Sequence, residues 1–215
     1  MRHHYSPGKR IILFLAGLFI AGMGVALSTR PGLGPSPITS LPYVMTFAIP
    51  LTLGTLTVIV NIVFIFVQMA ILRRWFDWSL FLQLPTLLFF GLFIDTGMYL
   101  TGFFIPENYF LRIIEEIIGC AVLAYGIICL LAANISLMPG DGLIKTISQV
   151  YHRGYGAVKM CFDVGIVASA VIFSLCWFGN VTGVREGTLV ASFLVGFIIK
   201  QQQGVIRLLK FKILK

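Results

Sequence analysis

The chain alternates between long apolar runs and short polar breaks. Six apolar runs are long enough to cross about 30 Å of hydrocarbon as a helix, which takes roughly 17 to 25 residues. They predict six transmembrane helices, so the predicted fold class is an all-α membrane protein. The predicted spans cover residues 11–28, 54–72, 79–100, 112–133, 157–178 and 187–203.

This pattern recurs within the chain at a constant offset of 102 residues. Each copy has one apolar span, a polar stretch broken by glycine and proline, and two further apolar spans. Three spans is an odd number, so two copies in series would lie in opposite orientations across a bilayer, as in inverted-repeat transporters. We expect repeats over residues 1–104 and 105–215, within one membrane domain. The register is marked by Gly17 and Gly119, Gly24 and Gly126, Pro37 and Pro139, Leu41 and Leu143, Gly54 and Gly156, and Asn61 and Asp163.

Each copy breaks its helical pattern after the first span. Residues 31–47 and 137–148 contain prolines and glycines that a continuous helix does not tolerate. Thr39 and Asp141 are good N-cap residues at matching positions, so we expect a short half-helix to start at each, with positive partial charge at its N-terminus. The turns at Thr39, Gly140 and Asp141 are therefore candidate substrate-binding residues. The alternative is that these stretches are ordinary loops or interfacial helices.

Ionisable groups inside predicted spans need an explanation, because a charge near the middle of the bilayer costs roughly 2.5 to 3.5 kcal/mol. Asp163 lies in the fifth span with Lys159 one turn earlier on the same face, and its repeat mate Asn61 is also polar. With Lys145 on the second half-helix, they predict a site for an anionic solute or the carboxylate of a zwitterion. The structural alternative is a self-neutralising Lys159–Asp163 pair.

Other charged residues have simpler interpretations. Asp95 and Lys200 lie near the ends of their spans, where we expect their side chains to reach the interface. Glu115 and Glu116 lie near the outer end of the fourth span and are interpreted as interface residues.

The composition agrees with a membrane protein and decides its orientation. The chain is 58% hydrophobic and 11% charged, whereas soluble domains are roughly 25% charged. Eleven basic residues outside the spans fall on the side of the N-terminus and three on the other side. The positive-inside rule then places both termini in the cytoplasm. The net charge of +8 reflects this topology, and no nucleic-acid partner is expected.

The sequence offers no conspicuous catalytic or metal-binding chemistry. It contains no Walker loop, HExxH motif or Ser/His/Asp set, and its three histidines do not form a ligand pattern. We expect no enzyme activity, no catalytic residue, no metal and no cofactor. Four cysteines fall inside predicted spans and are expected to behave as small apolar residues: Cys120, Cys129, Cys161 and Cys176.

Three motifs carry a resemblance to a known family. They are residues 32–37 after the first span, residues 139–143 after the fourth, and residues 183–188 before the sixth. Together they resemble the YczE/YitT-like family of small bacterial multi-spanning membrane proteins, over nearly the whole chain. The resemblance implies a bacterial cytoplasmic (inner) membrane protein of five or six helices, and it implies little about chemistry.

Two functions stay open at this point. The first is a secondary transporter or permease for a small solute, with the lipid bilayer around it and energy from an ion gradient or a separate subunit. The second is a non-transporting membrane partner that regulates or stabilises another membrane complex, which the small size and short loops favour. A homo-oligomer or a membrane-protein partner is left open. The predicted substrate-binding residues are Thr39, Asn61, Gly140, Asp141, Lys145, Lys159 and Asp163.

Overall fold

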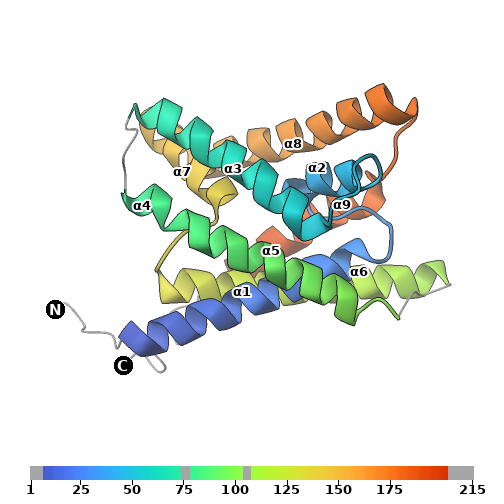
Figure 1. Ribbon diagram of the computed structural model, residues 1–215, viewed down its shortest axis with the longest axis horizontal. Helices are drawn as coiled ribbons and strands as arrows, with labels where there is room; N and C mark the ends of the chain where they lie inside the picture. Colours follow the sequence, from blue (N-terminus) through green and yellow to red (C-terminus); the bar gives the residue numbers. More distant parts are fainter. Residues whose placement is uncertain (1–6, 74–77, 104–107, 203–215) are drawn as a thin grey trace.

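The computed structural model describes residues 7–73, 78–103 and 108–202, and within these ranges every regular element is a helix (Figure 1). The helices are α1 (Pro7–Thr29), α2 (Pro37–Thr46), α3 (Leu53–Leu72), α4 (Trp78–Phe81), α5 (Gln83–Leu100), α6 (Tyr109–Ala133), α7 (Pro139–Val150), α8 (Tyr155–Phe178) and α9 (Glu186–Gln201).

Five of the described helices are long and apolar enough to cross a membrane: α1, α3, α5, α6 and α8. The apolar part of α9, Glu186–Ile199, is shorter. Helices pair their backbone groups internally, which a bilayer requires because its core offers no water to unpaired N–H and C=O groups. The described chain is therefore consistent with an all-α membrane protein, and the sixth span stays a prediction.

Prolines decide where several helices begin. The half-helices start at Pro37 and Pro139, two residues before the predicted N-caps, so the N-cap assignment of Thr39 and Asp141 is wrong. Proline suits the first helical position because its missing N–H would be unpaired there anyway. Pro85 acts differently, since it cannot donate to the Phe81 carbonyl one turn earlier. This accounts for the break between α4 and α5 inside the predicted span 79–100.

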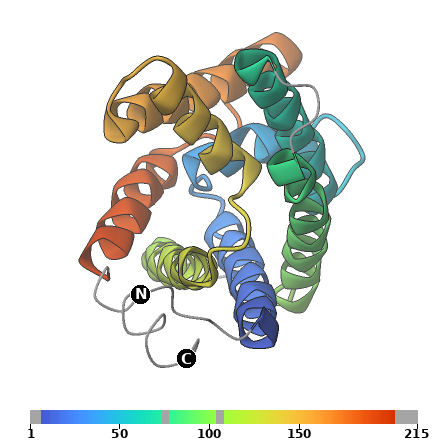
Figure 2. The same cartoon turned by 90° about the vertical axis from the view of Figure 1, so that its left-hand side faces the viewer.

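The helices occur in two corresponding sets. The starts of α1 and α6, of α2 and α7, and of α3 and α8 are each 102 residues apart, as in the sequence repeat, and those of α5 and α9 are 103 apart. The packing follows the same correspondence. α1 packs on α6 at the centre, α5 packs on α1 and α9 on α6. Each half-helix packs on a long helix of the other half, α2 on α8 and α7 on α3, so the two half-helices are exchanged between the halves. Figure 2 shows α1 and α6 side by side, with α3 and α5 on one flank and α9 on the other.

Glycines allow α1 and α6 to approach closely. A methyl group added to Gly24, Gly119 or Gly126 would collide with the backbone of the opposite helix. At Gly17 the added carbon would lie 3.0 Å from Cys129 Cβ. Small residues of α1 and α6 thus form a packing seam within the chain, as small residues commonly do between membrane helices.

A second core cluster lies between α2, α3, α7 and α8. Phe64 of α3 meets Phe162 of α8 edge to face, with ring centroids 5.3 Å apart. The cluster consists largely of residue pairs related by the repeat offset. These pairs are Val60 and Phe162, Phe64 and Ile166, Leu41 and Leu143, and Met45 and Ile147.

Candidate functional site

The N-terminal turns of the two half-helices meet inside the molecule. A carbon added to Gly140 of α7 would lie 3.5 Å from Cδ1 of Ile38 in α2, which is ordinary van der Waals contact. Helix N-termini expose unpaired N–H groups and carry positive partial charge, which favours anions. Two such termini therefore converge from the two halves of the chain.

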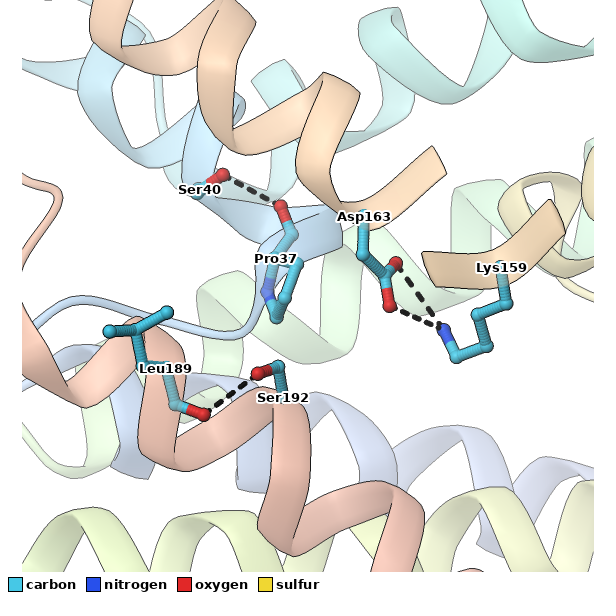
Figure 3. Close-up of polar contacts among 6 residues, drawn as sticks. All are labelled: Pro37, Ser40, Lys159, Asp163, Leu189 and Ser192. Carbon is cyan, nitrogen blue, oxygen red and sulfur yellow. Dashed lines mark hydrogen bonds and ion pairs between the residues drawn. The ribbon is translucent and has the colours of Figure 1, made fainter. Parts of the chain in front are cut away.

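Charged and polar side chains of α8 line one face of that helix next to α7. Tyr155, Lys159 and Asp163 follow one another at four-residue spacing, which places them on the same side. Lys159 Nζ lies 3.2 Å from Asp163 Oδ2, so the predicted ion pair is present (Figure 3). Asp141, in the first turn of α7, interacts electrostatically with Lys159, Asp163 and the Tyr155 hydroxyl. We call Asp141, Tyr155, Lys159 and Asp163 the α7–α8 cluster.

The α7–α8 cluster is only partly shielded. The side chains of Lys159 and Asp163 keep 37% and 18% of their exposure. In Figure 3 the Asp163 carboxylate points toward the Lys159 ammonium on the same helix. The cluster is thus partly desolvated, which strengthens the interactions among its charges.

The electrostatics of Asp141 reflect this arrangement. Burial raises the pKa of its carboxyl, Lys159 opposes that shift and Asp163 adds to it. The cluster therefore contains one ammonium and two carboxyls, and burial favours the neutral form of one of these carboxyls, Asp141.

The first repeat carries a neutral and closed counterpart of the cluster. At the matching positions Thr39, Thr57 and Asn61 are all buried. Their hydrogen bonds stay local: Thr39 Oγ1 donates to the Ser36 carbonyl at 3.0 Å and Asn61 Nδ2 to the Thr57 carbonyl at 2.9 Å. None of these described bonds reaches the α7–α8 cluster.

The predicted site residues therefore separate into two groups. The structure brings Gly140, Asp141, Lys159 and Asp163 together around the start of α7. Lys145 is exposed on α7, and no described hydrogen bond or ion pair joins it to this cluster. Tyr155 was not among the predicted residues, although its spacing before Lys159 and Asp163 is a signal that could have found it.

A pair of buried glutamines fixes the position of α7. Gln68 of α3 donates from Nε2 to the Pro139 carbonyl at 3.0 Å and to Gln83 Oε1 of α5 at 3.2 Å. Gln83 Nε2 donates back to Gln68 Oε1 at 3.3 Å. Gly142 makes room for this pair, because an added carbon there would lie 2.8 Å from Gln68 Oε1. The sequence analysis did not single out these glutamines, which lie in different predicted spans.

Asp95 has a structural role that its position near the end of a predicted span did not indicate. Its Oδ1 accepts from the Gly54 N–H at 2.8 Å and its Oδ2 from the Thr52 hydroxyl at 2.7 Å. Asp95 therefore caps the start of α3 from α5, and its position at the membrane interface stays a prediction. The side chain of Lys200, for which the same was expected, lies outside the described part of the structure.

The two halves differ in how their outer helices pack. α3 packs along α5, whereas the described residues of α8 make no comparable contact with the corresponding helix α9. Figure 2 shows α9 beside α6 and away from α8. The charged half of the molecule is consequently more open than its neutral counterpart.

Long apolar helices, internally paired backbones and a few clustered charges are features of a multi-pass membrane protein. Within that class the chain belongs to the family described as "Family of unknown function (DUF6198)", whose model matches residues 8–203. An "Uncharacterized protein" of Haemophilus influenzae (strain ATCC 51907 / DSM 11121 / KW20 / Rd) is 26% identical over 197 residues, which cover 89% of this chain and 82% of that protein. No solved structure matches the chain. The YczE/YitT-like resemblance stays a prediction beside this family.

Proposed function

We propose that the chain is a secondary transporter of a small solute that bears a carboxylate. The solute would bind where the N-terminal turns of α2 and α7 face the α7–α8 cluster. The observation that carries the proposal is the contact between these two half-helix N-termini beside Lys159 and Asp163.

The architecture supports this function. Corresponding helices begin at a constant offset, and the half-helices are exchanged between the two halves. Discontinuous helices at the interface of two repeats are the usual location of substrate sites in inverted-repeat transporters. With an odd number of spans per repeat, the two halves of this chain would have opposite orientations in the bilayer.

The chemistry of the site favours a carboxylate-bearing solute. The two helix N-termini and the Lys159 ammonium would attract the carboxylate. Asp141 and Asp163 would pair with an ammonium group, so a zwitterion would satisfy both parts of the site. Tyr155 would supply a hydroxyl as a donor or an acceptor.

The packing difference between the halves supports a gated site. The neutral half is closed by the contact of α3 with α5, while α8 lies apart from α9. If α8 packed on α9 while α3 moved away from α5, the site would be exposed to the other side of the membrane. Such rocking of one repeat against the other is the usual form of alternating access.

The first test is a thermal-shift screen of the purified chain against small carboxylates, amino acids and other zwitterions. A ligand should raise the melting temperature of the wild type, because it binds the folded state. Asp163→Asn and Asp141→Asn should abolish that rise. Glu186→Gln is the matched control, since Glu186 is half-exposed and pairs with Arg185 away from the cluster.

The second test is uptake of that ligand into proteoliposomes under an imposed ion gradient. Uptake that Asp163→Asn abolishes and Glu186→Gln leaves intact supports a carrier. Binding without uptake would contradict transport. If no solute binds and a protein co-purifies with the chain from crosslinked membranes, the alternative of a regulatory membrane partner replaces the proposal.

A further inference from the structure

A second group of acidic side chains lies inside the molecule, on α6. Glu115 and Glu116 are only 6% and 2% exposed, so their interpretation as interface residues is wrong. They lie near the N-terminal end of a helix that packs on α1 and α9.

The two glutamates are poorly paired. Both carboxyl oxygens of Glu115 and Oε2 of Glu116 have no hydrogen-bond partner among the described residues. The remaining oxygen, Glu116 Oε1, accepts only from the Cys120 thiol, at 3.6 Å. Neither glutamate belongs to the ion pairs of the described chain, which are Lys159–Asp163 and Arg185–Glu186.

Two arginines lie near the pair, Arg30 of α1 and Arg112 of α6 itself. Arg30 of α1 interacts electrostatically with Glu115, but its guanidinium donates to the Met98 carbonyl and to Thr101 Oγ1 of the α5 end. Tyr43 of α2 is the titratable group that faces Glu116 from the half-helix. Arg112 lies one turn before the pair on α6 itself.

A buried carboxylate is expensive unless donors or a cation compensate its charge. Protonation removes that cost, because a neutral carboxyl gains a donor and loses the charge. We infer that Glu115 and Glu116 form a proton-binding site, in which Glu116 holds a proton between α6 and Tyr43 of α2. The site is separate from the α7–α8 cluster, and it would exist whether or not the chain transports a solute.

Infrared spectroscopy of the full chain in lipid nanodiscs tests this inference directly. A protonated carboxyl has a carbonyl stretching band that an ionised carboxylate lacks. The wild type should show such a band near neutral pH and lose it on alkaline titration. Glu116→Gln should remove most of the band. Glu115→Gln should shift the pH at which the band is lost. Glu186→Gln, the control, should leave both the intensity of the band and that pH unchanged. Because Asp141 is also a buried carboxyl, the reading is the difference between wild type and variant. Absence of the band in the wild type, or a band of the same intensity in the wild type and in Glu116→Gln, would overturn the inference.

Thermal unfolding gives a second readout. A folded state that holds a proton released on unfolding loses stability as pH rises. The melting temperature of the wild type should therefore fall toward alkaline pH, and Glu116→Gln should flatten that dependence. Parallel pH profiles for the two proteins would contradict a bound proton on Glu116.

Replacing sodium by choline distinguishes the proton from a metal cation. The proton site predicts the same titration of the infrared band in both salts. If the band appears and titrates in choline salt but not in sodium salt, a sodium ion competes with the proton for the two carboxyls, and the inference of a site for a proton alone is contradicted.

Discussion

At the scale of single residues, the two repeats keep their geometry and differ in chemistry. Thr39, Thr57 and Asn61 are buried and bonded within their own helices, while their mates Asp141, Lys159 and Asp163 form a half-exposed charged cluster. The corresponding positions thus hold neutral, buried side chains in one copy and charged, partly exposed side chains in the other.

Both Lys145 and Lys159 are predicted from the sequence to bind the solute, but only Lys159 belongs to the α7–α8 cluster. Lys159→Met should weaken binding of a carboxylate-bearing ligand by about tenfold or more, which is about 1.4 kcal/mol, because it removes the ammonium between two carboxyls. Lys145→Met should leave affinity close to that of the wild type, since Lys145 is exposed and outside the cluster. Titration calorimetry with the ligand from the thermal screen measures both. Equal losses for the two variants would contradict the site described here.

The glutamine pair should stabilise the start of α7. Gln68→Leu leaves the Pro139 carbonyl and the Gln83 amide without their partner, so we expect a loss of about 1 to 3 kcal/mol in unfolding free energy. Gln149→Leu, on the exposed face of the same half-helix, should cost little. Denaturant unfolding in detergent compares the two. A Gln68 variant as stable as the control would show that the pair does not hold α7.

At the scale of helices, most boundaries follow from local sequence, and most site contacts do not. Apolar runs predicted the long helices closely, and Pro37 and Pro139 mark the starts of the half-helices, although the predicted N-caps lie three residues after the observed ones, Ser36 and Met138. The burial of Glu116 and the Gln68–Gln83 pair could not be predicted, because each depends on a helix distant in sequence. The contact of Ile38 with Gly140 likewise requires the packing of α2 and α7 across the two halves.

The seam between α1 and α6 predicts a strong effect of side-chain size. Gly126→Leu should destabilise the chain by about 1 to 3 kcal/mol, because the added carbons meet the backbone of α1 at Ala21. Gly165→Leu in α8 is the control, since nothing lies within 4 Å of a carbon added there. Melting temperatures of both variants in detergent provide the comparison. A stable Gly126 variant would mean that the two helices can move apart at little cost.

At the scale of the whole molecule, the repeat and the basic residues predict the orientation in the membrane. With cytoplasmic termini, the turn after α5 faces outward and the turn after α7 faces the cytoplasm. In a chain without its native cysteines, Phe103→Cys should react with an impermeant thiol reagent in intact cells. His152→Cys should react only after the membrane is opened. Reaction of both in intact cells would contradict the opposed orientation of the two halves.

The exchange of half-helices also affects how the chain is assembled. α2 and α3 leave the ribosome well before α7 and α8, which are the helices that cover them. The surfaces of α2 and α3 that contact α8 and α7 therefore stay uncovered until the second half is inserted. The fold is therefore completed only after the second half is inserted, and a chain that stops after α5 lacks the helices that pack on α2 and on one side of α3.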